Sequence, residues 1–141
     1  MVIVADASLA LKWYLDEALA DEADDWLTEH QRRIVVPEVF LIEVTGALVR
    51  RANIDKSLRA ASEESIARFV ALFDEGMIKL DYGGPHRMAR AAKLALDLGH
   101  PLKDCIYLAL AVDLGCDLVT ADARFAAKAR GVWAGVRALG A

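Results

Sequence analysis

Four carboxylates stand in apolar surroundings, and together they have the chemistry of a divalent metal site. Asp6 follows the run VIVA, Glu43 interrupts FLIEVTGALV, Asp104 lies near the start of LKDCIYLALAV, and Asp122 follows LVTA. Carboxylates that gather in one place repel one another and raise each other's pKa values unless a cation lies between them. Mg²⁺ and Mn²⁺ prefer oxygen ligands, and a bound ion lowers the pKa of a water molecule that can then attack a phosphodiester.

Three of these acids also have an ordinary structural explanation. Asp6 and Asp122 each precede a helical pattern, and Asp is a common residue at the N-cap position. Asp104 falls in the first turn of its helix, where a negative charge complements the helix dipole. The residue types alone leave both explanations open for each of the three.

Glu43 is harder to explain as a structural residue, because it lies in the middle of a strongly apolar helix. A buried carboxylate that has no partner is costly, so it must be paired or remain protonated. Arg50 and Lys12 are the candidate partners for an ion pair. Lys12 alternatively pairs with another acid of the site or lies on the surface.

The pattern of apolar residues predicts strands that alternate with helices, which is typical of a parallel sheet covered by helices on both faces. We expect strands at 2–5, 33–36, 77–80 and 118–120, with an edge strand near 136–139. We expect helices at 7–15, 18–31, 38–51, 55–75, 86–98, 102–114 and 123–130. The carboxyl ends of parallel strands lie at one edge of the sheet, so Asp6 and Asp122 are expected to approach each other there.

Length and composition favour one α/β domain over residues 1–141, with a real core, because 56% of the residues are hydrophobic. The net charge of −4 comes from 17 basic and 21 acidic residues. If four acids hold a metal, the remainder balances at 17 against 17, so net charge does not decide whether the substrate is a nucleic acid.

No signal peptide or membrane-spanning run is visible, so we expect a cytoplasmic protein. Cys105 and Cys116 lack metal or redox spacing and are expected to be buried, reduced thiols. The three histidines, His30, His86 and His100, lack ligand spacing and are interpreted as surface or loop residues.

Four segments in this order resemble a PIN-domain ribonuclease: VADASLALKW, PEVFLIEV, LKDCIYLALAVDLG and CDLVTADARFA. The resemblance runs from residue 1 to about 130 and is greatest to the VapC-type toxins of toxin–antitoxin pairs. It implies a three-layer α/β/α fold around a parallel sheet of four to five strands.

The resemblance also implies roles for individual residues. Asp6, Glu43, Asp104 and Asp122 would form the acidic site for Mg²⁺ or Mn²⁺. Asp6 and Asp104 would be direct ligands, Glu43 would act more through water, and Asp122 would bind the metal or support a ligand. Ser8 and Thr120 match polar positions that could orient water or phosphate; their alternatives are a helix-start residue and a strand residue bonded to a carbonyl.

Basic residues near these motifs are candidate contacts for RNA phosphates. Arg124 and Lys128 lie four apart on one helix face. Arg50 lies seven residues after Glu43, about 10 Å further along the helix. A looser row contains Arg87, Arg90 and Lys93. For each of them the alternative is a solvated basic surface.

The function implied is a metal-dependent endoribonuclease that arrests growth by cleaving cellular RNA. It would be a homodimer, inhibited by a VapB-type antitoxin that lays a segment across the site. One alternative is a PIN-type RNA-processing nuclease without an antitoxin. Others are a signalling receiver domain phosphorylated on aspartate, and a non-catalytic binding module on the same fold.

Overall fold

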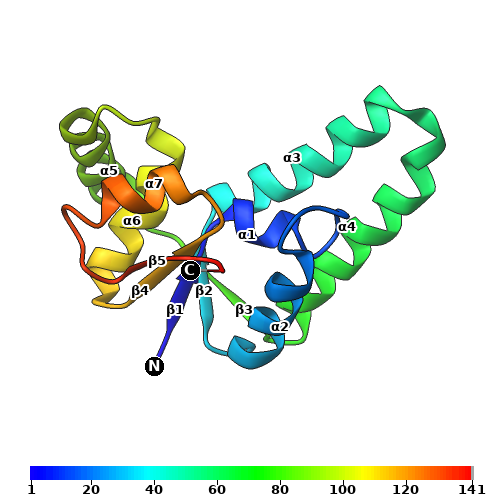
Figure 1. The fold of residues 1–141 in the computed structure, drawn as a ribbon, viewed down its shortest axis with the longest axis horizontal. Helices are drawn as coiled ribbons and strands as arrows, with labels where there is room; N and C mark the ends of the chain where they lie inside the picture. Colours follow the sequence, from blue (N-terminus) through cyan, green and yellow to red (C-terminus); the bar gives the residue numbers. More distant parts are fainter. Residues whose placement is uncertain (141) are drawn as a thin grey trace.

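The computed structural model describes residues 1–140, which contain a five-stranded parallel sheet with helices on both sides (Figure 1). The strands are β1 (Ile3–Ala5), β2 (Ile34–Pro37), β3 (Ile78–Asp81), β4 (Asp117–Thr120) and β5 (Val136–Ala138). Their order in the sheet is β3-β2-β1-β4-β5. All five strands were predicted, including the edge strand, and the fold is the expected three-layer α/β/α arrangement.

The strand order places a topological switch point beside β1. From β1 the chain adds β2 and β3 on one side, whereas β4 and β5 extend the sheet on the other. In open parallel sheets, ligands bind at the carboxyl ends of the strands where the order reverses. The order also differs from the 2-1-3-4-5 order of receiver-like folds, which argues against the receiver alternative.

Seven α-helices connect and cover the strands. They are α1 (Ala7–Leu11), α2 (Ala20–His30), α3 (Val39–Ile54), α4 (Arg59–Asp74), α5 (Gly84–Leu98), α6 (Leu102–Leu114) and α7 (Ala123–Ala129) in residues 1–140. In Figure 1, α5 and α6 lie on one side of the strands and α2 to α4 on the other. Helix α6 is buried on most of its circumference, as its nearly continuous apolar sequence predicted.

Three predicted boundaries were wrong for local reasons. Helix α1 ends at Leu11 because tight turns follow, in which Trp13 donates its backbone N–H to Ala10. Helix α2 begins at Ala20 because the preceding Leu19 has a φ of 67°, which a helix cannot include. The predicted helix 55–75 is divided, because Asp55 caps a separate 3₁₀ turn η1 (Lys56–Leu58) before α4.

The thiols of Cys105 and Cys116 are buried and unbonded, as predicted from their spacing. Over residues 1–140, none of the helices is both long enough and apolar enough to cross a bilayer.

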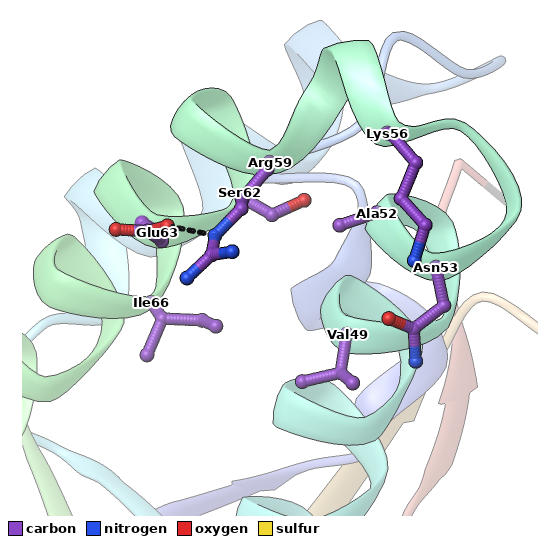
Figure 2. Close-up of a pocket in the computed structure, with 8 residues that line it drawn as sticks. All are labelled: Val49, Ala52, Asn53, Lys56, Arg59, Ser62, Glu63 and Ile66. Atoms are coloured by element: carbon purple, nitrogen blue, oxygen red, sulfur yellow. Dashed lines mark hydrogen bonds and ion pairs between the residues drawn. The ribbon is translucent and has the colours of Figure 1, made fainter.

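Helices α3 and α4 form a hairpin that projects from the body of the protein (Figure 1). A pocket of about 270 Å³ lies between them near η1. Figure 2 shows its apolar wall, Val49 and Ile66, and an ion pair between Arg59 and Glu63. The hydroxyl of Ser62 also lines it and is the one buried side-chain polar atom within residues 1–140 that lacks a hydrogen-bond partner.

Replacing Ser62 with alanine should stabilise the fold. The change removes a buried hydroxyl that makes no hydrogen bond and introduces the best helix former into α4. We expect the free energy of unfolding to rise by about 1–2 kcal/mol, measured by urea denaturation. The exposed Ala67→Ser on the same helix is the control and should lower it by about 0.5 kcal/mol. A neutral or destabilising Ser62→Ala would show that the hydroxyl is satisfied in solution.

Candidate active site

Asp6 is the centre of the site, and its carboxylate is fixed by donors from two neighbouring segments. It directly follows β1 and is 2% exposed. The Ser8 hydroxyl donates to Oδ1 at 2.5 Å, and the Thr120 hydroxyl, at the end of β4, donates to Oδ2 at 2.5 Å. The backbone N–H of Leu9 also donates to Oδ1, so Asp6 is indeed an N-cap for α1. The structural explanation therefore holds for Asp6, and its role as a metal ligand stays a prediction.

Ser8 and Thr120 have the same role toward Asp6. Their hydroxyl oxygens lie 3.2 Å apart, and each accepts a hydrogen bond from a backbone N–H of the segment after β4. Because each hydroxyl accepts from the backbone, its proton is available to the carboxylate. Thr120 therefore does not take its alternative of a bond to a nearby carbonyl, whereas Ser8 is also the helix-start residue of its alternative, as the second residue of α1.

Burial raises the pKa of Asp6 to about 6, although the hydrogen bonds from Ser8 and Thr120 oppose the shift. The negative charge of Asp104 raises it further. No Lys or Arg within residues 1–140 forms an ion pair with Asp6. The carboxylate is therefore a buried charge that a cation would stabilise.

Three of the four predicted carboxylates line one pocket of about 410 Å³. Asp6 comes from the end of β1, Glu43 from the second turn of α3, and Asp104 from the first turn of α6. The pocket lies at the switch point of the sheet, and Arg50 and Lys103 also line it. Residues far apart in sequence thus converge at the carboxyl end of β1, whereas Asp122, which the strand-end argument placed near Asp6, does not line this pocket.

Glu43 is held by a residue that the sequence analysis did not single out. The Tyr107 hydroxyl, from α6, donates to Glu43 Oε1 at 2.8 Å. Lys103 Nζ lies 3.8 Å from the other oxygen, Oε2. Burial raises the pKa of Glu43, whereas Tyr107 and Lys103 oppose the shift. The partners predicted for Glu43, Arg50 and Lys12, were wrong.

Asp104 is held by His100, which lies in the loop between α5 and α6, in agreement with its interpretation as a surface or loop residue. His100 Nε2 lies 2.6 Å from Asp104 Oδ2, and the imidazole stacks on Phe125 at 4.8 Å between ring centroids. The His100 side chain is only 11% exposed. A spacing of four residues before Asp104 is the signal that could have identified this pair.

Asp122 is placed differently from the other three acids. It is exposed, does not line the pocket, and accepts a hydrogen bond from the Phe125 N–H as the N-cap of α7. It reaches Asp6 only indirectly, because its backbone N–H donates to the Thr120 hydroxyl that binds Asp6. A metal-binding role for Asp122 stays a prediction.

The pocket offers the oxygen donors that a hard divalent cation prefers, but its residues do not form a complete set of ligands around one point. Among residues 1–140, no three Asp, Glu, His or Cys side chains stand close enough to surround an ion without moving. The carboxylates nevertheless face one pocket, and the charge on Asp104 raises the pKa values of both Asp6 and Glu43. Carboxylates that repel one another in this way are the donors that Mg²⁺ or Mn²⁺ requires.

Several basic residues proposed as RNA contacts have other partners. Arg87 forms ion pairs with Asp81 and Asp113, and Arg90 also pairs with Asp113. The third member of that row, Lys93, pairs with Asp97. None of the three lines the carboxylate pocket, and contact between this row and RNA stays a prediction.

Lys12 does not reach a site carboxylate either. Its ammonium lies 3.3 Å from Glu17 and donates to the carbonyl of Ala18. It therefore closes the turn between α1 and α2. Arg124 and Lys128 are exposed on α7, and neither forms an ion pair within residues 1–140.

The raised pKa of Asp6 predicts how the stability of the metal-free protein varies with pH. The folded state binds the proton up to about pH 6 and the unfolded chain only to about 3.8, so stability falls as pH rises through this window. Asp6→Asn removes that dependence. Between pH 3.8 and 7, the free energy of unfolding of wild type should therefore fall by about 3 kcal/mol relative to that of the variant. Urea denaturation in chelator measures both curves.

The control is Asp122→Asn, which changes an exposed N-cap carboxylate in the same way. Its stability should run parallel to that of wild type across the window. Parallel curves for Asp6→Asn as well would show that Asp6 is not a destabilised buried charge.

Comparison with known proteins agrees with the geometry. A family model described as the PIN domain matches residues 3–131. The chain is similar to the structure of PAE2754 from Pyrobaculum aerophilum, with a TM-score of 0.73, 23% identity, and coverage of 99% of this chain and 90% of that one. It is also similar to VapC20 from Mycobacterium tuberculosis, a sarcin–ricin loop cleaving toxin, with a TM-score of 0.69, 14% identity, and coverage of 89% and 93%.

At these identities the two structures show a shared fold. A search of curated proteins found no match. The family model extends over nearly the whole chain, from β1 to just past α7. The chain therefore belongs to the PIN-domain family, whose members are nucleases.

Proposed function

We propose that this protein is a divalent-metal-dependent endoribonuclease. The observation that carries the proposal is the convergence of Asp6, Glu43 and Asp104 in one pocket at the switch point of a PIN-domain sheet. The non-catalytic alternative does not require these carboxylates to share a pocket. We further propose that residues 1–141 act as one nuclease domain.

The residues have separable tasks in this proposal. Asp6 and Asp104, oriented by Ser8, Thr120 and His100, are the ligands for Mg²⁺ or Mn²⁺. When bound, the ion supplies a water of lowered pKa and stabilises charge on the phosphate.

Glu43 faces the same pocket with a raised pKa, so it can hold the attacking water and accept its proton. Asp122 would contribute only if α7 moves toward the pocket, because it caps that helix here.

The proposed substrate is single-stranded or looped RNA, whose backbone is open to attack. Arg50 and Lys103 line the carboxylate pocket and are cations suited to neighbouring phosphates. The similar structure VapC20 is a toxin that cleaves the sarcin–ricin loop. This similarity supports an RNA loop as the first substrate class to test.

We propose that the nuclease is a cytoplasmic toxin and a homodimer, inhibited by a VapB-type antitoxin. The similarity to VapC20 favours this role over RNA processing without an antitoxin. A small DNA-binding protein encoded next to this one would support the toxin role, and its absence would favour the processing role.

Cleavage of mixed cellular RNA tests the activity. Wild type should cleave in Mg²⁺ or Mn²⁺ and not in chelator, and Asp6→Asn should lose at least 100-fold in rate because it removes a charged ligand. Gel analysis of end-labelled RNA measures this, with Asp97→Asn on α5 as the control for loss of a carboxylate outside the pocket. Equal cleavage by wild type, by Asp6→Asn and in chelator would refute the proposed metal nuclease.

A second test concerns RNA binding by α7. Neutralising Arg124 and Lys128 to Gln should weaken RNA binding and reduce the slope of log K against log salt by about 0.7 for each phosphate that the protein no longer neutralises. Fluorescence anisotropy measures it, with Arg59→Gln and Lys93→Gln as a charge-matched control. If cleavage and the salt slope stay those of wild type, this pair of residues does not bind the substrate.

A further inference from the structure

Tyr107 carries a hydroxyl into the buried face of α6. Its side chain is fully buried, and it packs edge-on against Phe40 with ring centroids 6.5 Å apart. A phenylalanine would fill the same apolar space without carrying a hydroxyl into it. A buried tyrosine hydroxyl needs a hydrogen-bond partner, and here that partner is Glu43 Oε1 at 2.8 Å.

The two oxygens of Glu43 consequently have different surroundings. Oε1 is bound to the Tyr107 hydroxyl. Oε2 has only the ammonium of Lys103, at 3.8 Å and on a side chain that is 66% exposed. The rigid, buried partner thus holds one oxygen and leaves the other for whatever occupies the pocket.

We propose that Tyr107 is a positioning residue, which fixes Glu43 so that Oε2 alone serves the metal and its water. This inference rests on the proposed function and names the group that orients Glu43 for its role in it.

The hydrogen bond joins α3 to α6 across 64 residues of sequence. Tyr107 follows Asp104 by three residues, so one face of α6 carries one carboxylate and orients a second. Movement of α6 relative to α3 would therefore disturb Asp104 and Glu43 together.

The Tyr107 hydroxyl is suited to donate a hydrogen bond to Glu43 at every working pH. Burial and the charges of Glu43 and Asp6 raise the pKa of Tyr107 above its ordinary value. The hydroxyl therefore stays protonated and donates a hydrogen bond to the Glu43 carboxylate. Loss of such a supporting hydrogen bond typically costs 10- to 100-fold in metal affinity or activity.

The test is a double-mutant cycle of Tyr107→Phe and Glu43→Gln, with Mn²⁺ binding measured by calorimetry. Tyr107→Phe should lower Mn²⁺ affinity about tenfold in the wild-type background and less than twofold in Glu43→Gln. Tyr14→Phe is the matched control, because Tyr14 is a partly buried tyrosine packed against Trp13 and Phe69 outside the pocket. It should leave the affinity unchanged.

RNA cleavage provides the second readout. Tyr107→Phe should reduce kcat about tenfold with little change in KM, because it changes Glu43 and not the RNA-binding surface. Glu43→Asp, whose shorter side chain withdraws from the hydroxyl, should show a similar loss, to which Tyr107→Phe adds nothing. This variant keeps the test available if Tyr107→Phe alone folds poorly.

Equal Mn²⁺ affinity in wild type and Tyr107→Phe would overturn the inference, as would a full tenfold effect in the Glu43→Gln background. Absence of any Mn²⁺ binding by wild type would also overturn it. If Mn²⁺ binding depends on Tyr107 but wild type cleaves no RNA, the positioning role stands and the proposed ribonuclease activity fails.

Discussion

The burial of the Asp6 carboxylate is the constraint on which the site depends. A charge that is 2% exposed and has no basic partner within residues 1–140 is unfavourable on its own. The structure offsets part of this cost with the hydroxyls of Ser8 and Thr120. These bonds tie together β1, α1 and the end of β4, so the residues that stabilise the buried carboxylate also hold together the elements beside the pocket.

Much of the fold could be predicted because the signals were local. Short apolar runs indicated all five strands, and glycines marked the ends of α4, α5 and α6. The errors occurred where a single residue departed from its local pattern. Leu19 adopts a positive φ, and Asp55 caps a separate turn, and neither event leaves a mark in the apolar periodicity.

A residue of the candidate site could be predicted only where its own position in the sequence was unusual. Glu43 could be predicted because a carboxylate in an apolar helix needs an explanation. Tyr107 could not be predicted, because a tyrosine in a buried helix is ordinary until the carboxylate opposite its hydroxyl is known. His100 lies in a loop, as predicted, but its aromatic partner Phe125 and its place against the core come from the tertiary fold.

The hydrogen bond from Thr120 to Asp6 has a consequence for the order of events during synthesis. It joins residues 114 apart, and β1 stands in the middle of the sheet beside β4, which is synthesised much later. Such non-local parallel pairing comes late in folding. A ribosome must therefore release the chain through Thr120 before the pocket can close around Asp6, and a translation product truncated before Thr120 would lack this support for the site.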